Sequence, residues 1–210
     1  MSNQGKIFAL TGPSGVGKGF IKQHIKLHHP HLEQLTVATT RGKRPDDGKD
    51  RETGIPIGVF LERRNGGTIV FAHQPFGPEG DWYGFYAEQI QRLLADGKQV
   101  LTEIHVDNVG PFKTEFGEKV KILGLIADEM YLESNLICRG SETEEDRQHR
   151  LDLALKETEV IAQLVSQGLV DSVIEVNDDN REIIAQLALE KMNELGLEEV
   201  NSFRVRREYE

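Results

Sequence analysis

The sequence predicts an α/β protein with a mostly parallel sheet and helices on both of its faces. Short runs rich in Val, Ile and Leu alternate with longer segments in which apolar residues recur every three or four positions. This alternation is typical of parallel sheets, because two parallel strands need a crossover connection that is usually a helix. The alternation of strand and helix patterns stops between residues 35 and 86, where strand and turn signals follow one another instead.

The regular part of the chain supplies the core elements. In the first expected helix, Ile21 and Ile25 lie four positions apart and therefore on one face. We expect strands at 7–10, 100–104, 120–126 and 173–176, and helices at 18–27, 87–95, 130–137, 142–166 and 181–195.

The irregular stretch reads as an insertion into this core. Residues 55–60 and 68–72 have strand character, a glycine turn separates them, and prolines and glycines follow. We predict an inserted antiparallel β-rich subdomain at 35–86, carried on a core formed by 1–34 and 87–200. The tail at 201–210 is charged, and the pattern leaves open whether it is disordered or an extra strand.

Composition narrows the class of partner. The chain has 210 residues, enough for one well-buried core, and a formal net charge of -10. An acidic surface disfavours nucleic acid and anionic membranes, so we expect neither as a partner. A single cysteine, Cys138, excludes an internal disulfide, and no apolar run reaches membrane-spanning length. We expect a cytoplasmic protein, and the oligomeric state stays open.

Residues 12–18 read Gly-Pro-Ser-Gly-Val-Gly-Lys, the G-x-x-x-x-G-K pattern of a phosphate-binding loop. The context fits, because a buried strand precedes the loop and a helix begins at its lysine. Glycines let successive backbone N–H groups curl around phosphate oxygens, and the helix N-terminus adds partial positive charge. The pattern predicts a P-loop NTPase-type core that binds ATP through Gly12, Pro13, Ser14, Gly15, Val16, Gly17, Lys18 and Gly19.

One loop position departs from the usual pattern. The residue after the lysine is normally Ser or Thr, whose hydroxyl binds Mg²⁺, and here it is Gly19. We still expect Mg²⁺ as the cofactor, bound through water, with Glu103 at the end of a strand as the candidate that holds this water.

Four further motifs follow the loop in order. They are Thr39-Thr40-Arg41 with Arg44, Tyr83-Gly84 followed by an acidic strand end at Glu103, the 139–145 segment Arg-Gly-Ser-Glu-Thr-Glu-Glu with Arg150, and Val176-Asn177-Asp178-Asp179. Together with the loop they resemble the guanylate kinase family from residue 12 to residue 177. The resemblance implies an inserted subdomain that binds the phosphoryl acceptor and a helical lid at about 135–150.

The resemblance also implies roles for single residues. Lys18, Arg139 and Arg150 would act on the phosphoryl group in transfer, and Asn177 would lie near the adenine of ATP. For Arg147, one turn before Arg150, an ion pair with the acidic run that precedes it is the favoured interpretation. The phosphorylated acceptor would be bound by Arg41, Arg44, Tyr83, Glu103 and His105.

The same comparison shows where the match fails. Positions at which this family typically contacts the guanine or its phosphate hold Val37, Arg51, Val70, Phe85 and His105, and Asn135 stands where an earlier lid arginine is expected. A valine offers no hydrogen bond to the N–H groups of guanine. His105 itself is equally consistent with a phosphoryl-acceptor ligand and with a packed core residue.

Three functions therefore remain in view. The first is ATP-dependent phosphoryl transfer to GMP or dGMP, and the second is transfer to another nucleotide or to a ribose phosphate. The third is a non-catalytic guanylate-kinase-like binding module, which the intact loop and Lys18 disfavour. A cluster of His28, His29 and His31 reads as a solvated helix end rather than a metal site.

Overall fold

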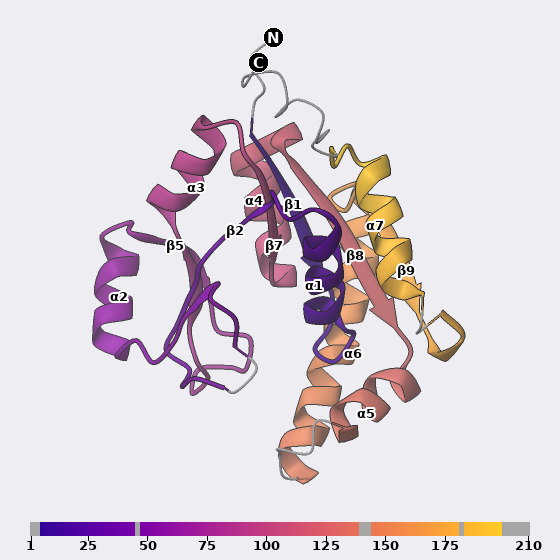
Figure 1. Ribbon diagram of the computed structural model, residues 1–210. Helices are drawn as coiled ribbons and strands as arrows, with labels where there is room; N and C mark the ends of the chain where they lie inside the picture. Colours follow the sequence, from indigo (N-terminus) through magenta and orange to yellow (C-terminus); the bar gives the residue numbers. More distant parts are fainter. Residues whose placement is uncertain (1–4, 45–46, 139–143, 181–182, 199–210) are drawn as a thin grey trace, which may run out of the picture.

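A computed structural model describes residues 5–44, 47–138, 144–180 and 183–198, arranged as two lobes (Figure 1). The first lobe is built on a five-stranded parallel sheet of order β2-β7-β1-β8-β9, and the second on a four-stranded sheet of order β4-β3-β6-β5. The strands are β1 Lys6–Thr11, β2 Glu33–Gln34, β3 Val37–Thr39, β4 Arg51–Glu52, β5 Ile69–His73, β6 Tyr83–Tyr86, β7 Gln99–Glu103, β8 Val120–Ala127 and β9 Ser172–Val176.

Helices cover both faces of the first sheet, as the alternation of segments predicts. Along β1, Phe8 and Leu10 belong to one buried cluster, whereas Ile7 and Ala9 belong to the other, because successive side chains of a strand point to opposite faces. The helices are α1 Lys18–His28, α2 Ile57–Asn65, α3 Ala87–Ala95, α4 Val109–Phe116, α5 Glu129–Cys138, α6 Glu144–Ser166 and α7 Ile184–Glu194.

The order of strands brings three carboxyl ends together at one edge of the sheet. Strand β1 lies between β7 and β8, and its register pairs Leu10 with Glu103 and Thr11 with Gly124. Loops that leave such an edge are the usual place for a ligand in an open parallel sheet. The loop 12–18 leaves this edge directly after β1.

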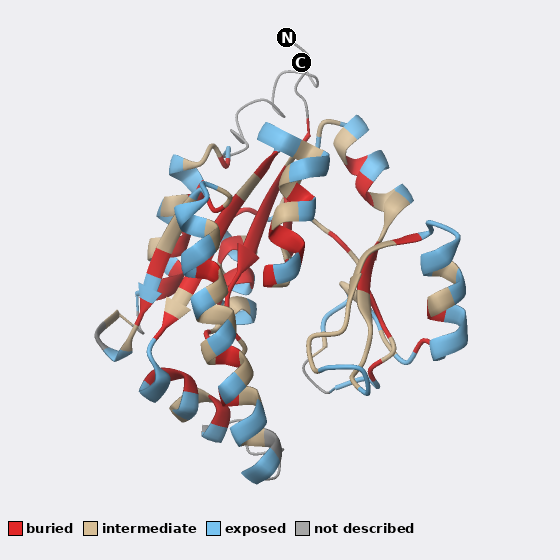
Figure 2. Cartoon of the chain, turned by 180° about the vertical axis from the view of Figure 1, so that it is seen from behind, coloured by how far each residue is buried: buried red, intermediate tan, exposed pale blue. Residues whose placement is uncertain are grey.

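The second sheet is mixed, which corrects the expectation of a purely antiparallel insertion. Strand β3 pairs parallel to β4 and antiparallel to β6. Residues 55–60, predicted as a strand, contribute instead to α2, which begins at Ile57 after Pro56. Only Phe60 of this helix is buried, and Figure 2 shows the outer face of α2 exposed. The fixed φ of proline suits a helix start, and the polar residues that follow favour a helix.

Helix α4 was also absent from the sequence prediction. Its first turn contains Gly110 and Pro111, which discourage a helical interpretation. A proline is nevertheless tolerated in a first turn, because the N–H groups there have no partner inside the helix. The helix is held in place by Phe112, which is fully buried between the first sheet and the second lobe.

A bulge in β5 sets the position of His73. Between Val70 and His73 the pairing with β6 shifts, and Phe71 adopts a left-handed conformation with φ 53°. The ring of Phe71 packs 4.2 Å from that of Phe112, measured between centroids. The extra residue places His73 opposite Tyr83 across the two strands.

Within the described parts of the chain, none of the helices combines the length and apolar character that crossing a membrane requires.

Candidate functional site

The loop 12–18 has the backbone shape that its glycines allow. Gly15 and Gly17 have φ values of 90° and 99°, in the region that favours glycine. At Gly12 a Cβ atom would lie 2.9 Å from the carbonyl oxygen of Leu125, so a larger residue does not fit there. Helix α1 begins at Lys18 immediately after the loop.

The start of α1 is left open for an anion. No side chain caps the helix within the described chain, and its first turn carries no acidic residue. The unpaired N–H groups and the helix dipole therefore favour a negatively charged ligand at this end. The Lys18 ammonium donates to the carbonyl oxygens of Gly12 and Pro13, at 2.6 and 3.0 Å, and so lies folded over the loop.

A buried lysine connects this region to the second lobe. Lys22, one turn after Lys18, pairs with Asp50 at 2.7 Å and with Glu103 at 2.9 Å. Burial acts to lower the pKa of Lys22, but the two carboxylates outweigh it and raise that pKa. Burial likewise acts to raise the pKa of Glu103, yet Lys22 and Lys18 lower it overall, so Glu103 is ionised.

His105 follows β7 and contacts α6. Its Nε2 atom donates to Oε1 of Glu157 at 2.8 Å, and Oε2 of Glu157 accepts from the Ser14 N–H at 3.0 Å. Burial acts to raise the pKa of Glu157, but the bond to His105, the charge of Lys18 and the Ser14 N–H lower it overall. An ionised carboxylate only accepts hydrogen bonds, which assigns the proton of the pair to Nε2.

A second histidine stacks on the first. The rings of His73 and His105 are 4.7 Å apart, and His73 also stacks on Tyr83 at 5.7 Å. The Asn108 amide donates to Nδ1 of His73 at 3.0 Å and to the carbonyl oxygen of Phe71 at 2.9 Å. Burial, assisted by His105, lowers the pKa of His73 to about 4, so this ring is neutral near pH 7.

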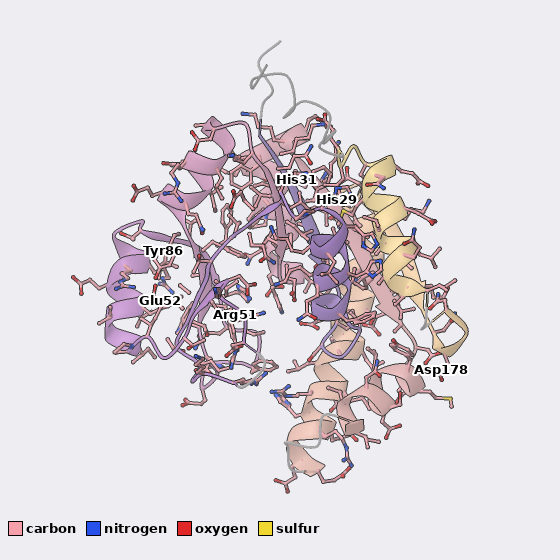
Figure 3. All side chains as sticks on the ribbon, viewed as in Figure 1. His29, His31, Arg51, Glu52, Tyr86 and Asp178 are labelled. Carbon is pink, nitrogen blue, oxygen red and sulfur yellow. The ribbon has the colours of Figure 1, made fainter. Side chains whose placement is uncertain are left out.

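The arginines predicted to bind the phosphoryl acceptor surround an acidic residue. Arg41 donates to Oδ1 of Asp47 at 2.6 Å, and Asp47 and the nearby Tyr83 raise the pKa of Arg41 against the effect of its burial. The Arg44 backbone N–H donates to the other oxygen of Asp47 at 2.7 Å, while the Arg44 side chain is exposed. Arg51 lies 3.7 Å from Asp47, and Figure 3 shows it on the second lobe, on the side toward the first.

Three apolar residues form a row beside this cluster. Val37 pairs with Phe85, and Phe85 pairs with Val70, on adjacent strands of the second sheet. Phe85 is 2% exposed and its ring packs at 5.7 Å against Phe112. This row contains no side-chain atom that accepts a hydrogen bond.

Comparisons with known proteins decide the family. The curated guanylate kinase of Synechococcus sp. (strain CC9902) is 30% identical over 194 residues, covering 89% of this chain and 95% of that protein. The guanylate kinase of Synechococcus sp. (strain CC9311) is 32% identical over 184 residues, covering 85% and 89%. The chain belongs to the guanylate kinase family.

The fold agrees with this membership. The crystal structure of guanylate kinase from Anaplasma phagocytophilum matches with a TM-score of 0.64 at 19% identity, covering 93% of this chain and 86% of that one. A scan against protein-family models found no match. As a member of the guanylate kinase family, the chain is a phosphotransferase of the nucleoside monophosphate kinase type.

Other residues that the family resemblance singled out lie around the same edge of the first sheet. Asn135 of α5 donates to the carbonyl oxygen of Gly15 at 3.0 Å. The Arg150 guanidinium of α6 lies 5.1 Å from the ring centre of Phe76, which belongs to the loop between β5 and β6. Asn177 follows β9 and exchanges two hydrogen bonds of 3.1 Å with Asn180. Arg139 lies outside the described residues.

Two smaller expectations have different outcomes. Arg147 pairs with Glu144, which confirms the ion pair predicted for it. His29 is buried, with 2% exposure, so the interpretation of a fully solvated histidine cluster is wrong for this residue. The described residues contain no group of three or more His, Cys, Asp or Glu side chains arranged to hold a metal ion.

Sequence reasoning missed Lys22, Glu157 and His73. Each is a single polar residue whose partners lie far away in the sequence, so no local motif marks it. Lys22 did carry one signal, because it stands one turn after Lys18 and next to the apolar Ile21. A charged residue at such a buried position needs a charged partner.

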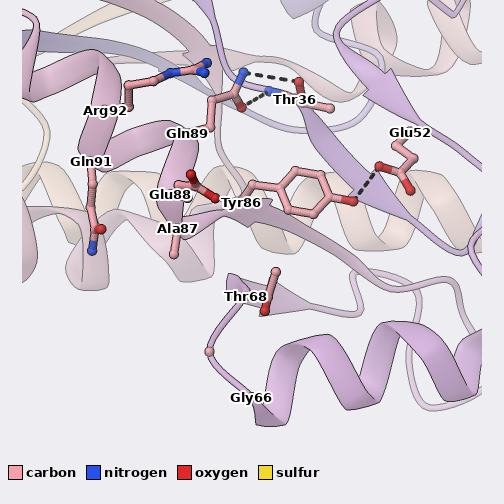
Figure 4. A pocket seen from close by; sticks show the side chains of 11 residues that line it. Thr36, Glu52, Gly66, Thr68, Tyr86, Ala87, Glu88, Gln89, Gln91 and Arg92 are labelled. Atoms are coloured by element: carbon pink, nitrogen blue, oxygen red, sulfur yellow. Dashed lines mark hydrogen bonds between the residues drawn. The ribbon is translucent and has the colours of Figure 1, made fainter.

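A cavity of about 660 Å³ lies elsewhere, between α3 and the turn after α2 (Figure 4). There the Tyr86 hydroxyl donates to Glu52 at 2.5 Å, and burial, with Glu52, raises the pKa of Tyr86 to about 12. None of the predicted site residues lines this cavity, so it is separate from the loop 12–18. The lining residues are Thr36, Glu52, Gly66, Gly67, Thr68, Tyr86, Ala87, Glu88, Gln89, Gln91 and Arg92.

Proposed function

We propose that this chain transfers the γ-phosphoryl group of ATP to GMP or dGMP. The observation that carries the proposal is the open N-terminus of α1 behind the loop 12–18, in a chain of the guanylate kinase family. Phosphoryl transfer demands positioning and positive charge more than covalent chemistry from the protein. The donor and phosphoryl-acceptor sides of the site supply both.

On the donor side, the triphosphate would lie in the loop 12–18. The backbone N–H groups of the loop and of the first turn of α1 would donate to its oxygens. Lys18 would exchange the carbonyl oxygens of Gly12 and Pro13 for phosphate oxygens, which carry more negative charge. Asn177, beyond β9 at the same edge of the sheet, would lie near the base.

On the phosphoryl-acceptor side, Arg41 is the principal phosphate ligand that we propose. Burial acts to lower its pKa, but Asp47 and Tyr83 outweigh this and raise it, so the guanidinium stays charged. Its fork geometry suits a phosphate, and the Tyr83 hydroxyl adds a donor to the same anion. Arg44 is exposed beside it and would complete the grip.

On α6, Arg150 is the lid arginine that we propose to act on the transferring phosphate, together with Lys18 and Arg139. The contact of Arg150 with Phe76 brings this helix to the second lobe. Closure of a lid over the site excludes water, which limits hydrolysis of ATP.

Mg²⁺ is the cofactor that we propose, carried by the phosphates of ATP. Gly19 supplies no hydroxyl, so the loop cannot bind the ion through a side chain. Glu103 is ionised and one of its oxygens is held by Lys22, which leaves the other to contact a water of the ion. These residues fit an ion bound mainly by phosphate and water, which would neutralise charge on the phosphates.

A second candidate differs only in the phosphoryl acceptor. The apolar row of Val37, Val70 and Phe85 stands where the family resemblance places contacts to guanine and its phosphate, and it offers no hydrogen bond to the N–H groups of the base. This observation favours another nucleoside monophosphate or a ribose phosphate as the substrate. Loss of such a hydrogen bond reduces discrimination between bases by orders of magnitude.

Measuring ADP production from Mg²⁺-ATP with GMP, dGMP, AMP, UMP and ribose 5-phosphate tests the two candidates. We expect turnover with GMP or dGMP that Lys18→Ala abolishes, whereas Lys156→Ala, an exposed control on α6, leaves it unchanged. Turnover with another monophosphate alone selects the second candidate. Turnover with none of them contradicts both and favours a non-catalytic binding module.

A further inference from the structure

We propose that Glu157 is a positioning residue that couples occupancy of the phosphate loop to occupancy of the phosphoryl-acceptor site. The inference rests on the proposed function, because it takes the loop 12–18 as the donor site and Arg41 as part of the phosphoryl-acceptor site. Glu157 lies within α6 and contacts groups from both sides. Its side chain is 15% exposed, so its carboxylate depends on these contacts for its charge balance.

A continuous line of contacts runs from one site to the other. The Ser14 N–H donates to Oε2 of Glu157 at 3.0 Å, and His105 donates to Oε1 at 2.8 Å. His105 stacks on His73 at 4.7 Å, and His73 stacks on Tyr83 at 5.7 Å. Tyr83 pairs across the strands with Thr39, two residues before Arg41, and lies near enough to Arg41 to raise its pKa.

The contacts cross the boundary between the two lobes. Ser14, Glu157 and His105 belong to the first lobe, whereas His73 and Tyr83 belong to strands of the second sheet. Arg150 and Glu157 are two turns apart on α6 and therefore share a face. Arg150 lies over Phe76, and Glu157 bonds to His105, which stacks on His73 of β5. The position of this face of α6 therefore depends on the position of the second sheet.

A triphosphate in the loop would compete with Glu157. Both are anions that attract Lys18, whose charge lowers the pKa of Glu157. Glu157 already accepts from the Ser14 N–H, and a phosphate oxygen in the loop would accept from the same donor. Glu157 cannot keep its bond to Ser14 when a phosphate oxygen takes that donor. Its charge is then compensated chiefly through His105, so the contact with the stacked rings of the second sheet becomes stronger.

Binding at the phosphoryl-acceptor site should in turn affect the phosphate loop. Ligand at Arg41 and Tyr83 orders the second sheet and the stacked histidines, which draws Glu157 toward His105 and frees the Ser14 N–H for the triphosphate. Linkage requires that each ligand then raise the affinity for the other by the same factor. We expect a factor of about ten for the unmodified protein, within the usual range for coupled sites.

Isothermal titration calorimetry tests the inference with a non-hydrolysable ATP analogue and GMP, each alone and each with the other present. The variants are Glu157→Ala and Glu157→Gln, and the matched control is Glu159→Gln, an exposed glutamate on the same helix. The glutamine variant keeps an oxygen that accepts from Ser14 and removes the charge. Thermal melting of each variant shows that it is folded.

We expect both Glu157 variants to bind the ATP analogue alone about five- to tenfold more tightly, since an anion no longer competes for the loop. We also expect the coupling factor to fall from about ten to below two. The control keeps both values. A purely structural role would weaken both ligands and leave the factor unchanged, which overturns the inference.

The binding of ATP analogue alone separates this inference from the proposed function. If the unmodified protein binds the analogue but no monophosphate, the proposed acceptor is wrong. Tighter binding of the analogue by the Glu157 variants then still supports the competition at Ser14, whereas unchanged binding refutes it. If both ligands bind without coupling in the unmodified protein, the inference fails and the proposed function stands.

Discussion

Replacement of Lys22 by Met removes a charge that two half-buried carboxylates share. Asp50 and Glu103 have side-chain exposures of 12% and 18%, and Lys22 lies within 2.9 Å of each. Methionine has a similar length and a good helix propensity, so the change isolates the charge. Removing one partner of a buried ion pair costs about 3–5 kcal/mol, because the other partner is left uncompensated.

The loss has a characteristic dependence on pH. Burial alone acts to raise the pKa of Asp50 and of Glu103, but contacts with Lys22 lower both overall. Such groups stabilise the fold above their ordinary pKa values and lose this contribution as pH falls through the lowered ones. In Lys22→Met the carboxylates take up protons more readily, so the deficit is largest near pH 7 and narrows toward about pH 4.

Urea denaturation and thermal melting at pH 7 and at about pH 4 measure the effect. For a chain of this size we expect the melting temperature to fall by roughly 6–20 °C at pH 7, using about 2–4 °C per kcal/mol. Lys156→Met is the control, since Lys156 is exposed on α6. A loss under about 1 kcal/mol, or one that does not change with pH, refutes the assignment of Lys22 as the shared counter-charge.

Three further substitutions test the loop 12–18, the phosphoryl-acceptor site and a buried hydrogen bond of the first lobe. Gly12→Ala brings a Cβ atom within 3.0 Å of the Leu125 Cβ, which should lower the stability of the fold by about 1–3 kcal/mol and weaken ATP binding. An unaltered melting temperature would be the contrary result. Arg41→Lys keeps the positive charge but loses the forked guanidinium. It should raise the KM for the phosphoryl acceptor about tenfold or more while the KM for ATP stays within about twofold. Equal changes in both KM values contradict the assignment of Arg41 to the phosphoryl-acceptor site. Asp171→Ala removes the oxygen that accepts from the Ile122 N–H at 2.7 Å and should cost about 1–3 kcal/mol in urea denaturation, and a neutral outcome counts against that bond.

Most elements of the first lobe were predictable because their signals are local, although α4 was missed. Helix α3 begins and ends at the predicted residues, and β8 matches its predicted run to within one residue. The second lobe was harder to predict, since α2 leaves Ile57 58% exposed and so reverses the usual meaning of an apolar run. Strand β4 consists of Arg51 and Glu52, which carry no strand signal of their own.

The site residues likewise include some that a local motif predicts and others that only the packing reveals. The loop 12–18 is a contiguous motif, so its shape could be inferred from residue spacing. The contact from Glu157 to Ser14 joins residues that are far apart in the sequence, and only the packing of α6 beside the loop creates it. Arg41 and Asp47 are closer to each other in the sequence than Ser14 and Glu157 are, but their pairing depends on a turn that no sequence motif predicts.

The proposed function requires a triphosphate to bind at the start of α1, against the loop 12–18 and Lys18. Calorimetric titration of Mg²⁺ with a non-hydrolysable ATP analogue into the unmodified protein and Lys18→Ala measures this directly. We predict one binding site in the unmodified protein and a loss of affinity of about tenfold or more in the variant, as expected when a charge-assisted hydrogen bond is removed. Equal affinity in both proteins, or no binding to the unmodified one, contradicts this assignment of the ATP site.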